Sequence, residues 1–291
     1  MPDAGGLTVA IVRACLREGR GGSPTAVVVG EGPGGEQCRA VPARTGASHA
    51  VLVSAEDGGP GGPEVALRFF TAAGELPACG HGTLAALAFL AERAGGGEYR
   101  ATVRTAGGVS AGRAARVGGV LTASFDVGAV EVHGPAAAGG HDDVLDALGL
   151  APGGPAGGVR VASTGRPRLL VPVPTRSALA ALAPDADRLR AACDRLGLLG
   201  CYVYSVPTAG GRLAARMFAP SIGVPEDIAN ANSTACLAAH LAGAGLPGIT
   251  VDMGDSLGAP ATVTAAVRGS GPGAPVGIGG TAVVARTVRL R

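Results

Sequence analysis

Apolar and polar residues alternate along several short segments of the chain, with glycines between them. A period of two is typical of a strand with one face buried. Four alternating segments and two shorter apolar runs predict strands at residues 65–69, 121–125, 262–268, 282–290, 169–173 and 202–205. The chain is therefore expected to consist largely of short strands.

Three segments break this rhythm and predict helices. Residues 83–94 and 233–242 are apolar nearly all round, and each run ends at a glycine. A helix without a polar face belongs in a protein interior. Residues 185–196 instead carry Asp and Arg on one side, which predicts an amphipathic surface helix.

The two apolar helices are preceded by similar sequences, which indicates an internal duplication. Each approach has Arg-X-Phe, then Gly, then Pro, then a polar or Gly-rich turn. The predicted fold class is α+β, with two pseudo-symmetric lobes. Each lobe is expected to be a curled, mostly antiparallel sheet or barrel around one buried helix, and both helix N-termini are expected at a cleft between the lobes. We place the lobes at residues 1–128 and 129–291, with 128–140 as the linker and a last strand that could return to the first lobe.

The composition excludes several classes of protein. Hydrophobic residues make up 47% and charged residues 16%, and the net charge is only +2, so a nucleic-acid binder is not expected. The chain has no lysine, which excludes Schiff-base chemistry and lysine-anchored pyridoxal phosphate. The six cysteines lack zinc-site spacing, and we see neither a signal peptide nor an apolar run long enough for a membrane span. A reduced, cytoplasmic protein is expected.

The starts of the two apolar helices are the candidate functional segments. Unpaired amide groups and a partial positive charge make a helix N-terminus suitable for binding an anion. Cys79–Thr83 and Glu226–Thr234 would then hold a carboxylate substrate and stabilise a carbanion as a proton leaves. Taken alone, the first segment could equally be a structural turn with a buried thiol and a hydrogen-bonded histidine.

Several motifs in these segments resemble the PhzF-like (phenazine biosynthesis-like) family. The segment at 68–87, R-F-F-T-A-A-G-E-L-P-A-C-G-H-G-T-L-A-A-L, is similar to the family's E-L-P to C-G-H-A-T motif. The segment at 226–241, E-D-I-A-N-A-N-S-T-A-C-L-A-A-H-L, resembles the second motif, E-D-P-A-N/T-G-S-A. Further similar segments lie at 22–29, 161–173 and 254–260. The resemblance covers essentially the whole chain.

This resemblance implies a diaminopimelate epimerase-like fold, a catalytic cleft between the lobes, no cofactor and a homodimer. In well-understood members a glutamate in S-E-T-T-F shuttles a proton between two carbons, while the histidine of C-G-H and the aspartate of E-D-P hold the substrate. The positions that match are His81 and Asp227, with Gly80 supplying an amide and Ser48 matching the serine. His49 stands where the family has its glutamate.

An imidazole at position 49 is still suited to moving a proton near neutrality. A nearby carboxylate would raise its pKa, whereas burial and helix dipoles would lower it, and the sequence leaves the sign open. Ile228, Ala231-Asn232 and Ala259 also depart from the family pattern, which points to a different substrate. Diaminopimelate epimerase uses two cysteines; Cys79 matches the first, but Asn230 occupies the place of the second, which disfavours a two-cysteine racemase.

The sequence therefore predicts a cofactor-independent isomerase that shifts a double bond in a small unsaturated amino or carboxylic acid, such as a pyrroline carboxylate in antibiotic-type metabolism. The predicted catalytic residues are His49, Asp227 and His81. The predicted substrate-binding residues are Ser48, Cys79, Gly80, Gly82, Asn230, Asn232 and Ser233. No metal is expected. The alternatives are an amino-acid racemase or epimerase, a non-catalytic binding relative, and a member in which His49 is a spectator.

Overall fold

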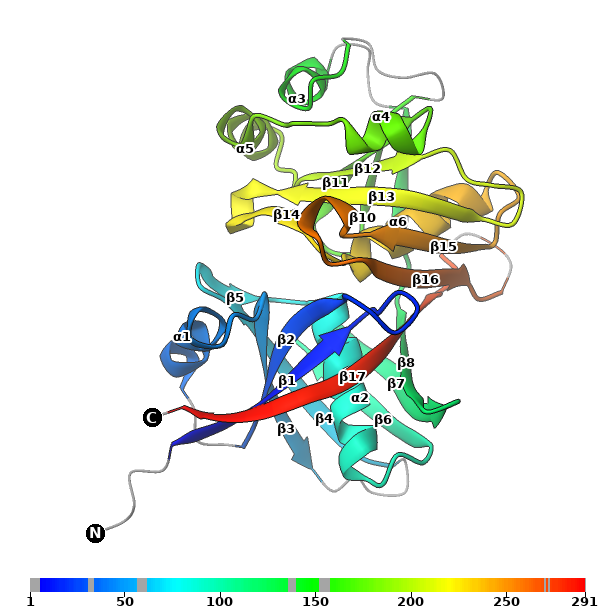
Figure 1. Cartoon of the computed structure of the whole chain (residues 1–291). Coiled ribbons are helices and arrows are strands. Elements are labelled where there is room, and N and C mark those ends of the chain that lie inside the picture. Colours follow the sequence, from blue (N-terminus) through cyan, green and yellow to red (C-terminus); the bar gives the residue numbers. More distant parts are fainter. Residues whose placement is uncertain are drawn as a thin grey trace. The chain divides into compact units, whose positions relative to one another are not determined.

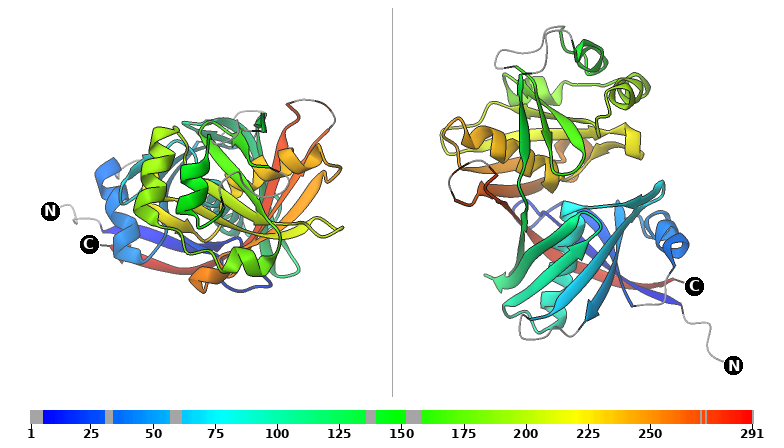
Figure 2. Two further views of the ribbon diagram at one scale, coloured as in Figure 1. Left: turned by 90° about the horizontal axis from the view of Figure 1, so that it is seen from above. Right: turned by 180° about the vertical axis from the view of Figure 1, so that it is seen from behind.

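The computed structural model describes residues 6–290 except 31–33, 57–61, 136–139, 152–157, 270 and 272. The chain folds as two compact units (Figure 1 and Figure 2). The first contains Met1–Asp126 and Gly279–Arg291, and the second contains Val127–Ile278. The last strand therefore begins in the second unit and continues through the first. No helix in the described ranges is long and apolar enough to span a membrane.

The first unit is a curled sheet around one helix. Its strands are β1 (Leu7–Ala14), β2 (Ser23–Val29), β3 (His49–Glu56), β4 (Glu64–Thr71), β5 (Gly74–Leu76), β6 (Tyr99–Thr105), β7 (Gly108–Val117), β8 (Val120–Val127) and β17 (Val276–Leu290). The pairing runs β17–β1–β2–β3–β4–β6–β7–β8 and returns from β8 to β17. This order closes the sheet into a barrel.

Helix α2 (Gly80–Arg93) lies inside this barrel, and α1 (Gly35–Thr45) covers its outer face (Figure 1). Eleven residues of α2 are buried, as expected for a helix that is apolar all round. On β2 and β3, Ala26, Val28, Ala50 and Leu52 pack against α1. Because successive side chains of a strand point to opposite faces, His49 on β3 and Thr25 on β2 face α2.

The second unit repeats this arrangement. Its strands are β9 (Glu131–Pro135), β10 (Arg160–Ser163), β11 (Pro167–Val173), β12 (Cys201–Ser205), β13 (Arg212–Ala219), β14 (Val224–Asp227), β15 (Gly248–Met253) and β16 (Ala261–Val267). Its helices are α3 (Asp142–Ala147), α4 (Arg176–Ala180), α5 (Ala186–Arg195) and α6 (Ala231–Ala242), with 3-10 turns at Pro220–Ile222 and Asp255–Leu257. Helix α6 packs against β9, β10, β15 and β16, and α3, α4 and α5 cover another face of the sheet.

The two units share one order of strand pairing. In the first, β1–β2 is antiparallel, β2–β3 parallel, β3–β4 and β4–β5 antiparallel, β4–β6 parallel and β6–β7 antiparallel. The strands β10 to β16 have the same sequence of directions. The central helix follows the short strand β5 or β14 in both units. The predicted α+β class and pseudo-symmetric lobes are confirmed.

Local contacts repeat as well. Arg68 and Arg216, on β4 and β13, each donate two hydrogen bonds to one glutamate, Glu75 and Glu226 respectively. Each guanidinium also lies over the ring of the phenylalanine two residues later. In both central helices the fourth residue is a threonine whose hydroxyl donates to the carbonyl of the N-cap residue. Such agreement in side-chain geometry supports a true duplication.

Two sequence-based expectations need correction. The segment at 128–140 is not simply a linker, because it contains β9, which pairs with β10; part of the segment lies outside the described residues. Helices α1, α3 and α4 were not predicted. Helix α1 contains Pro42 and few apolar residues, so its sequence lacks a clear helical period. The predicted helices at 83–94, 185–196 and 233–242 correspond to α2, α5 and α6.

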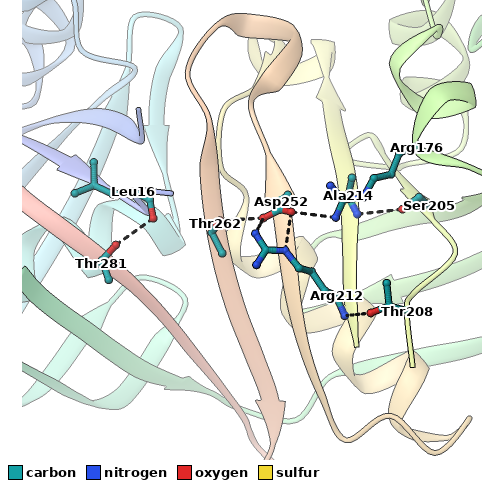
Figure 3. Close-up of polar contacts among 9 residues, drawn as sticks. All are labelled: Leu16, Arg176, Ser205, Thr208, Arg212, Ala214, Asp252, Thr262 and Thr281. Atoms are coloured by element: carbon teal, nitrogen blue, oxygen red, sulfur yellow. Dashed lines mark hydrogen bonds and ion pairs between the residues drawn. The ribbon is translucent and has the colours of Figure 1, made fainter. Parts of the chain in front are cut away.

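A buried carboxylate joins four elements of the second unit, β13, β15, β16 and α4. Asp252 on β15 accepts two hydrogen bonds from Arg212 on β13, at 3.0 and 2.9 Å, and one each from Arg176 and Thr262 (Figure 3). Nearby, Ser205 on β12 accepts from the amide of Ala214. In the first unit the hydroxyl of Thr281 donates to the carbonyl of Leu16, which fastens the end of β1 to β17.

Candidate active site

Three of the predicted site residues meet at the start of α2, and we call them the histidine–cysteine cluster: His49, Cys79 and His81. The Nε2 atom of His81 lies 3.0 Å from Nδ1 of His49, and the rings meet edge to face with centroids 4.5 Å apart. The Sγ atom of Cys79 lies 3.5 Å from the same Nε2 atom. All three side chains are buried. One hydrogen bond thus joins the two imidazoles.

The local fold explains why these side chains converge. His49 is the first residue of β3 and, by strand alternation, points towards α2. Cys79 is the N-cap residue of α2 and His81 is its second residue. Gly82 allows this close approach, because a Cβ atom there would lie 3.0 Å from Cδ1 of Phe69 and 3.1 Å from Sγ of Cys79.

Burial lowers the pKa of His49 well below its usual value near 6.5, and the neighbouring His81 lowers it further. Burial acts because a charged imidazolium loses its hydration inside the protein. The sequence left open whether the pKa of His49 is raised or lowered, and the structure indicates that it is lowered. His49 is therefore a neutral imidazole at neutral pH. A neutral imidazole has one nitrogen that can accept a proton.

The first turn of α2 has no side-chain cap. The thiol of Cys79 accepts no hydrogen bond from the helix, whereas many helices are capped by an oxygen at this position. The first-turn residues are Gly80, His81 and Gly82, and none carries an acidic side chain. The amide groups at this end are therefore suited to a carboxylate or an enolate.

The start of α6 differs in this respect, although it is the equivalent point of the duplicated unit. Asn230 is the N-cap residue, its side-chain oxygen accepts from the amide of Ser233 at 2.9 Å, and its Nδ2 donates to Asp227 at 3.0 Å. Asp227 is buried at the end of β14, and Asn232 is half-buried in the first turn. We call Asp227, Asn230, Asn232 and Ser233 the aspartate–asparagine cluster.

Cys79 and Asn230 hold the same N-cap position in the two units. A pair of opposed cysteines at these two positions is therefore not present. Cys236, the other thiol in α6, is the sixth residue of that helix and is fully buried. It cannot replace the N-cap thiol, because it lies more than one helical turn inside the helix.

Ser48 lies just before β3 and is held by hydrogen bonds to the segment that begins β2. Its hydroxyl donates to the carbonyl of Pro24 at 3.0 Å and lies 2.9 Å from the hydroxyl of Ser23. Its amide also donates to the carbonyl of Pro24. These bonds fix the chain just before β3 and so help to position His49. The role of Ser48 in substrate binding stays a prediction.

Two buried polar residues near these clusters, Arg168 and Thr25, were not predicted from the sequence. Arg168 on β11 is almost fully buried, and its guanidinium donates to Ser233, Thr164 and the carbonyl of Arg166. Thr25 pairs with His49 in register, and its buried hydroxyl has no hydrogen-bond partner among the described residues. Arg168 lies in an otherwise apolar strand and Thr25 in the run S-P-T-A-V-V-V, so only burial in the folded chain singles them out.

The structure therefore brings together His49, Cys79 and His81 in one unit, and Asp227, Asn230 and Ser233 in the other. That Asp227 lies across a substrate from His49 stays a prediction. So do the catalytic and binding roles assigned to all of these residues.

Comparison with known proteins places this arrangement in a family. A family model described as phenazine biosynthesis-like protein, PhzC-PhzF, matches residues 14–287. An uncharacterised isomerase of Deinococcus radiodurans is 32% identical over 273 residues, which cover 87% of this chain and 84% of that protein. A trans-2,3-dihydro-3-hydroxyanthranilate isomerase of Pseudomonas fluorescens is 31% identical over 185 residues, or 62% of this chain and 61% of that protein.

The fold agrees with that of a solved relative. The structure of a predicted epimerase from Pseudomonas aeruginosa superposes with a TM-score of 0.82 and 26% identity, covering 98% of this chain and 99% of that chain. The resemblance found from the sequence motifs is therefore confirmed over nearly the full length. The chain belongs to the PhzC-PhzF family of phenazine biosynthesis-like proteins.

Proposed function

We propose that this protein is an isomerase that moves a proton between two carbons of a small unsaturated amino or carboxylic acid without a cofactor. The observation that carries the proposal is the 3.0 Å hydrogen bond between Nδ1 of His49 and Nε2 of His81 in a buried position. Curated relatives in the family are named isomerases, which supports the reaction class.

The two imidazoles give His49 both an acid and a base form. When His49 donates the shared proton from Nδ1 to His81, its Nε2 atom carries no proton and can accept one from carbon. The pair then holds one more proton and a positive charge, which is balanced by the negative charge left on the substrate, and Nε2 of His49 returns a proton to the second carbon. The lowered pKa of His49 keeps the pair neutral before the substrate loses its proton, so that His49 is ready to act as the base. One buried pair can therefore take and return a proton without a metal or a second base.

The start of α2 supports a substrate with a carboxylate. Its first-turn amides have no side-chain cap, and a partial positive charge at this helix end would stabilise negative charge on the substrate. We assign Gly80 and Gly82 to this contact, since neither carries a side chain that would hinder close approach. Cys79 contacts His81 and is assigned to positioning that ring rather than to proton transfer.

The aspartate–asparagine cluster is assigned to holding the polar part of the substrate. Asp227 is fixed by the amide of Asn230, while Ser233 is fixed by Arg168. Ala231 and Asn232 stand where the family usually has Gly-Ser. A ring imine such as a pyrroline carboxylate is the substrate class that we favour. A homodimer, a cytoplasmic location and a part in antibiotic-type metabolism complete the proposal.

Proton transfer can be tested by incubation in deuterium oxide. The purified protein would be offered trans-2,3-dihydro-3-hydroxyanthranilate and a panel of pyrroline carboxylates, with mass spectrometry and NMR of the recovered acids. We expect deuterium at one carbon and a shifted double bond. Exchange with inversion and no shifted bond would instead indicate an epimerase. Tight binding of an acid without any exchange would contradict the isomerase proposal and favour a binding protein.

A further inference from the structure

The histidine–cysteine cluster also has the composition of a metal site. One ligand atom from each of His49, Cys79 and His81 can be chosen so that all three lie within 4.8 Å of one another. No other group of three such side chains occurs in the part of the chain that the structure describes. The three donors come from the start of a strand and the start of a helix, both of which are held by regular hydrogen bonds.

Two of the three spacings between the donors are close to those around a tetrahedral ion. With zinc bonds of about 2.0–2.1 Å to nitrogen and about 2.3 Å to sulfur, tetrahedral edges are about 3.3 Å between two nitrogens and about 3.6 Å between nitrogen and sulfur. The observed distances are 3.0 Å from Nδ1 of His49 to Nε2 of His81, and 3.5 Å from that Nε2 to Sγ of Cys79. All three ligand atoms lie within 4.8 Å of one another, so an ion could enter once the side chains adjust to the tetrahedral edges.

The donor types select the kind of ion. Two imidazole nitrogens and a thiolate favour zinc over magnesium or calcium, which prefer oxygen ligands. Three protein ligands leave a fourth position for water. Thr25 is the register partner of His49 on the neighbouring parallel strand, about 4.8 Å away between strands, and faces the same side. Its unpartnered buried hydroxyl is suited to bind such a water.

We propose that His49, Cys79 and His81 bind a zinc ion, and that zinc in this position inhibits the enzyme reversibly. Binding displaces one proton from the thiol of Cys79. The proton shared by the two imidazoles moves to an outer ring nitrogen, because both inner nitrogens now coordinate the ion. The two rings can then no longer exchange that proton. Zinc binding is independent of the proposed function, whereas inhibition rests on it. This ion was not expected from the cysteine spacing, because the ligands are separated along the chain.

Cobalt(II) offers a direct test of the binding site. Metal-free protein would be titrated with cobalt chloride while absorbance is recorded. We expect intense visible bands of a tetrahedral ion and a thiolate-to-cobalt charge-transfer band in the near ultraviolet. Cys79→Ser should lose the charge-transfer band, and His49→Ala should weaken binding at least tenfold. Cys38→Ser is the matched control, because Cys38 is a buried residue of α1 outside the cluster and its replacement should leave both signals unchanged.

The result that overturns the site is the absence of a charge-transfer band, or a band that persists in Cys79→Ser. Zinc should displace cobalt and abolish both signals. Inhibition is measured separately, as loss of deuterium exchange on adding zinc and its recovery on adding a chelator. A normal cobalt spectrum with undiminished exchange would leave the zinc site standing and contradict the role of His49 in proton transfer.

Discussion

The chemistry proposed for the first unit depends on His49, Cys79 and His81 at the start of α2, whose ligand atoms lie within 4.8 Å of one another. All three side chains are buried, and burial decides how they behave. His49 and His81 share one hydrogen bond, and neither is more than 4% exposed. The sequence could identify both residues by their motifs. It could not predict the direction of the pKa shift of His49, because that depends on burial and on the ring beside it.

The lowered pKa predicts a specific dependence of stability on pH. An unfolded histidine binds a proton below about pH 6.5, whereas folded His49 does so only at a lower pH. The folded state therefore holds fewer protons in this window, and the free energy of unfolding should fall as the pH falls from 7 towards 5. The slope for one proton is about 1.4 kcal/mol per pH unit at most.

Urea unfolding at several pH values in metal-free buffer would measure this dependence. His49→Gln is the comparison, since it lacks the titrating group and should show a shallower fall over the same window. Other histidines contribute to both proteins, so the difference between the two curves is the quantity of interest. Equal slopes would mean that His49 titrates normally in the folded protein.

Cys79 is expected to matter little for turnover. Its equivalent in the second unit is Asn230, so no opposing thiol is available for two-base racemisation. Cys79→Ser should retain turnover within about tenfold of the wild type, because it keeps a small polar group beside His81. Steady-state kinetics would measure this. A loss of about a thousandfold, typical of removing an essential acid or base, would favour the racemase alternative.

At the scale of elements, close packing at the start of α2 brings the cluster together. Gly80 and Gly82 are poor helix formers, which is why the sequence predicted a helix only from residue 83. The barrel compensates for them, since Phe69 of β4 packs against Gly82. Helix propensity therefore predicted the helix correctly, but it placed the start at residue 83 instead of Gly80.

Gly82→Ala tests this packing. The added Cβ would lie 3.0 Å from the ring of Phe69, which is fully buried in the core. We expect a loss of about 1–2 kcal/mol in the free energy of unfolding, as overpacking outweighs the gain in helix propensity. Gly97→Ala is the control, because no atom lies within 4 Å of its Cβ position, and its effect should stay within about 0.5 kcal/mol. A stabilised Gly82→Ala protein would refute the packing argument.

Prediction from sequence succeeded where the pattern was periodic and failed where packing decides. The six predicted strands all occur, as do the three predicted helices. Strand β9 was missed because E-V-H-G-P carries few apolar residues, and its place is fixed by pairing with β10. Arg168 was missed because an arginine in a strand is ordinarily solvated, and its burial arises from contacts with Ser233 and Thr164.

At the scale of the whole molecule, the duplication provides matched pairs of interactions in different surroundings. The Arg68–Glu75 and Arg216–Glu226 pairs have the same bidentate geometry. The side chains of the first pair are 51% and 40% exposed, whereas those of the second are both 12% exposed. Arg216 also donates to the carbonyls of Leu179 and Leu182.

Double-mutant cycles on the two pairs should give different coupling energies. Water screens the exposed pair, so alanine replacements at Arg68 and Glu75 should show a coupling below about 1 kcal/mol. The largely buried pair of Arg216 and Glu226 should show a coupling of roughly 2 kcal/mol or more, since each charge is left with little water when its partner is removed. Chemical unfolding of the single and double mutants measures both. Equal couplings would show that burial does not distinguish the duplicated pairs.

Proton transfer through His49 is the central claim, and deuterium exchange by its variants tests it most directly. With an acid that the wild-type protein labels, His49→Ala should lose exchange by a thousandfold or more while binding the acid within about tenfold, because the residue moves a proton rather than holding the ligand. His49→Glu restores the carboxylate that the family motif carries and should recover measurable exchange. Exchange at the wild-type rate in His49→Ala would show that the proton moves through another residue.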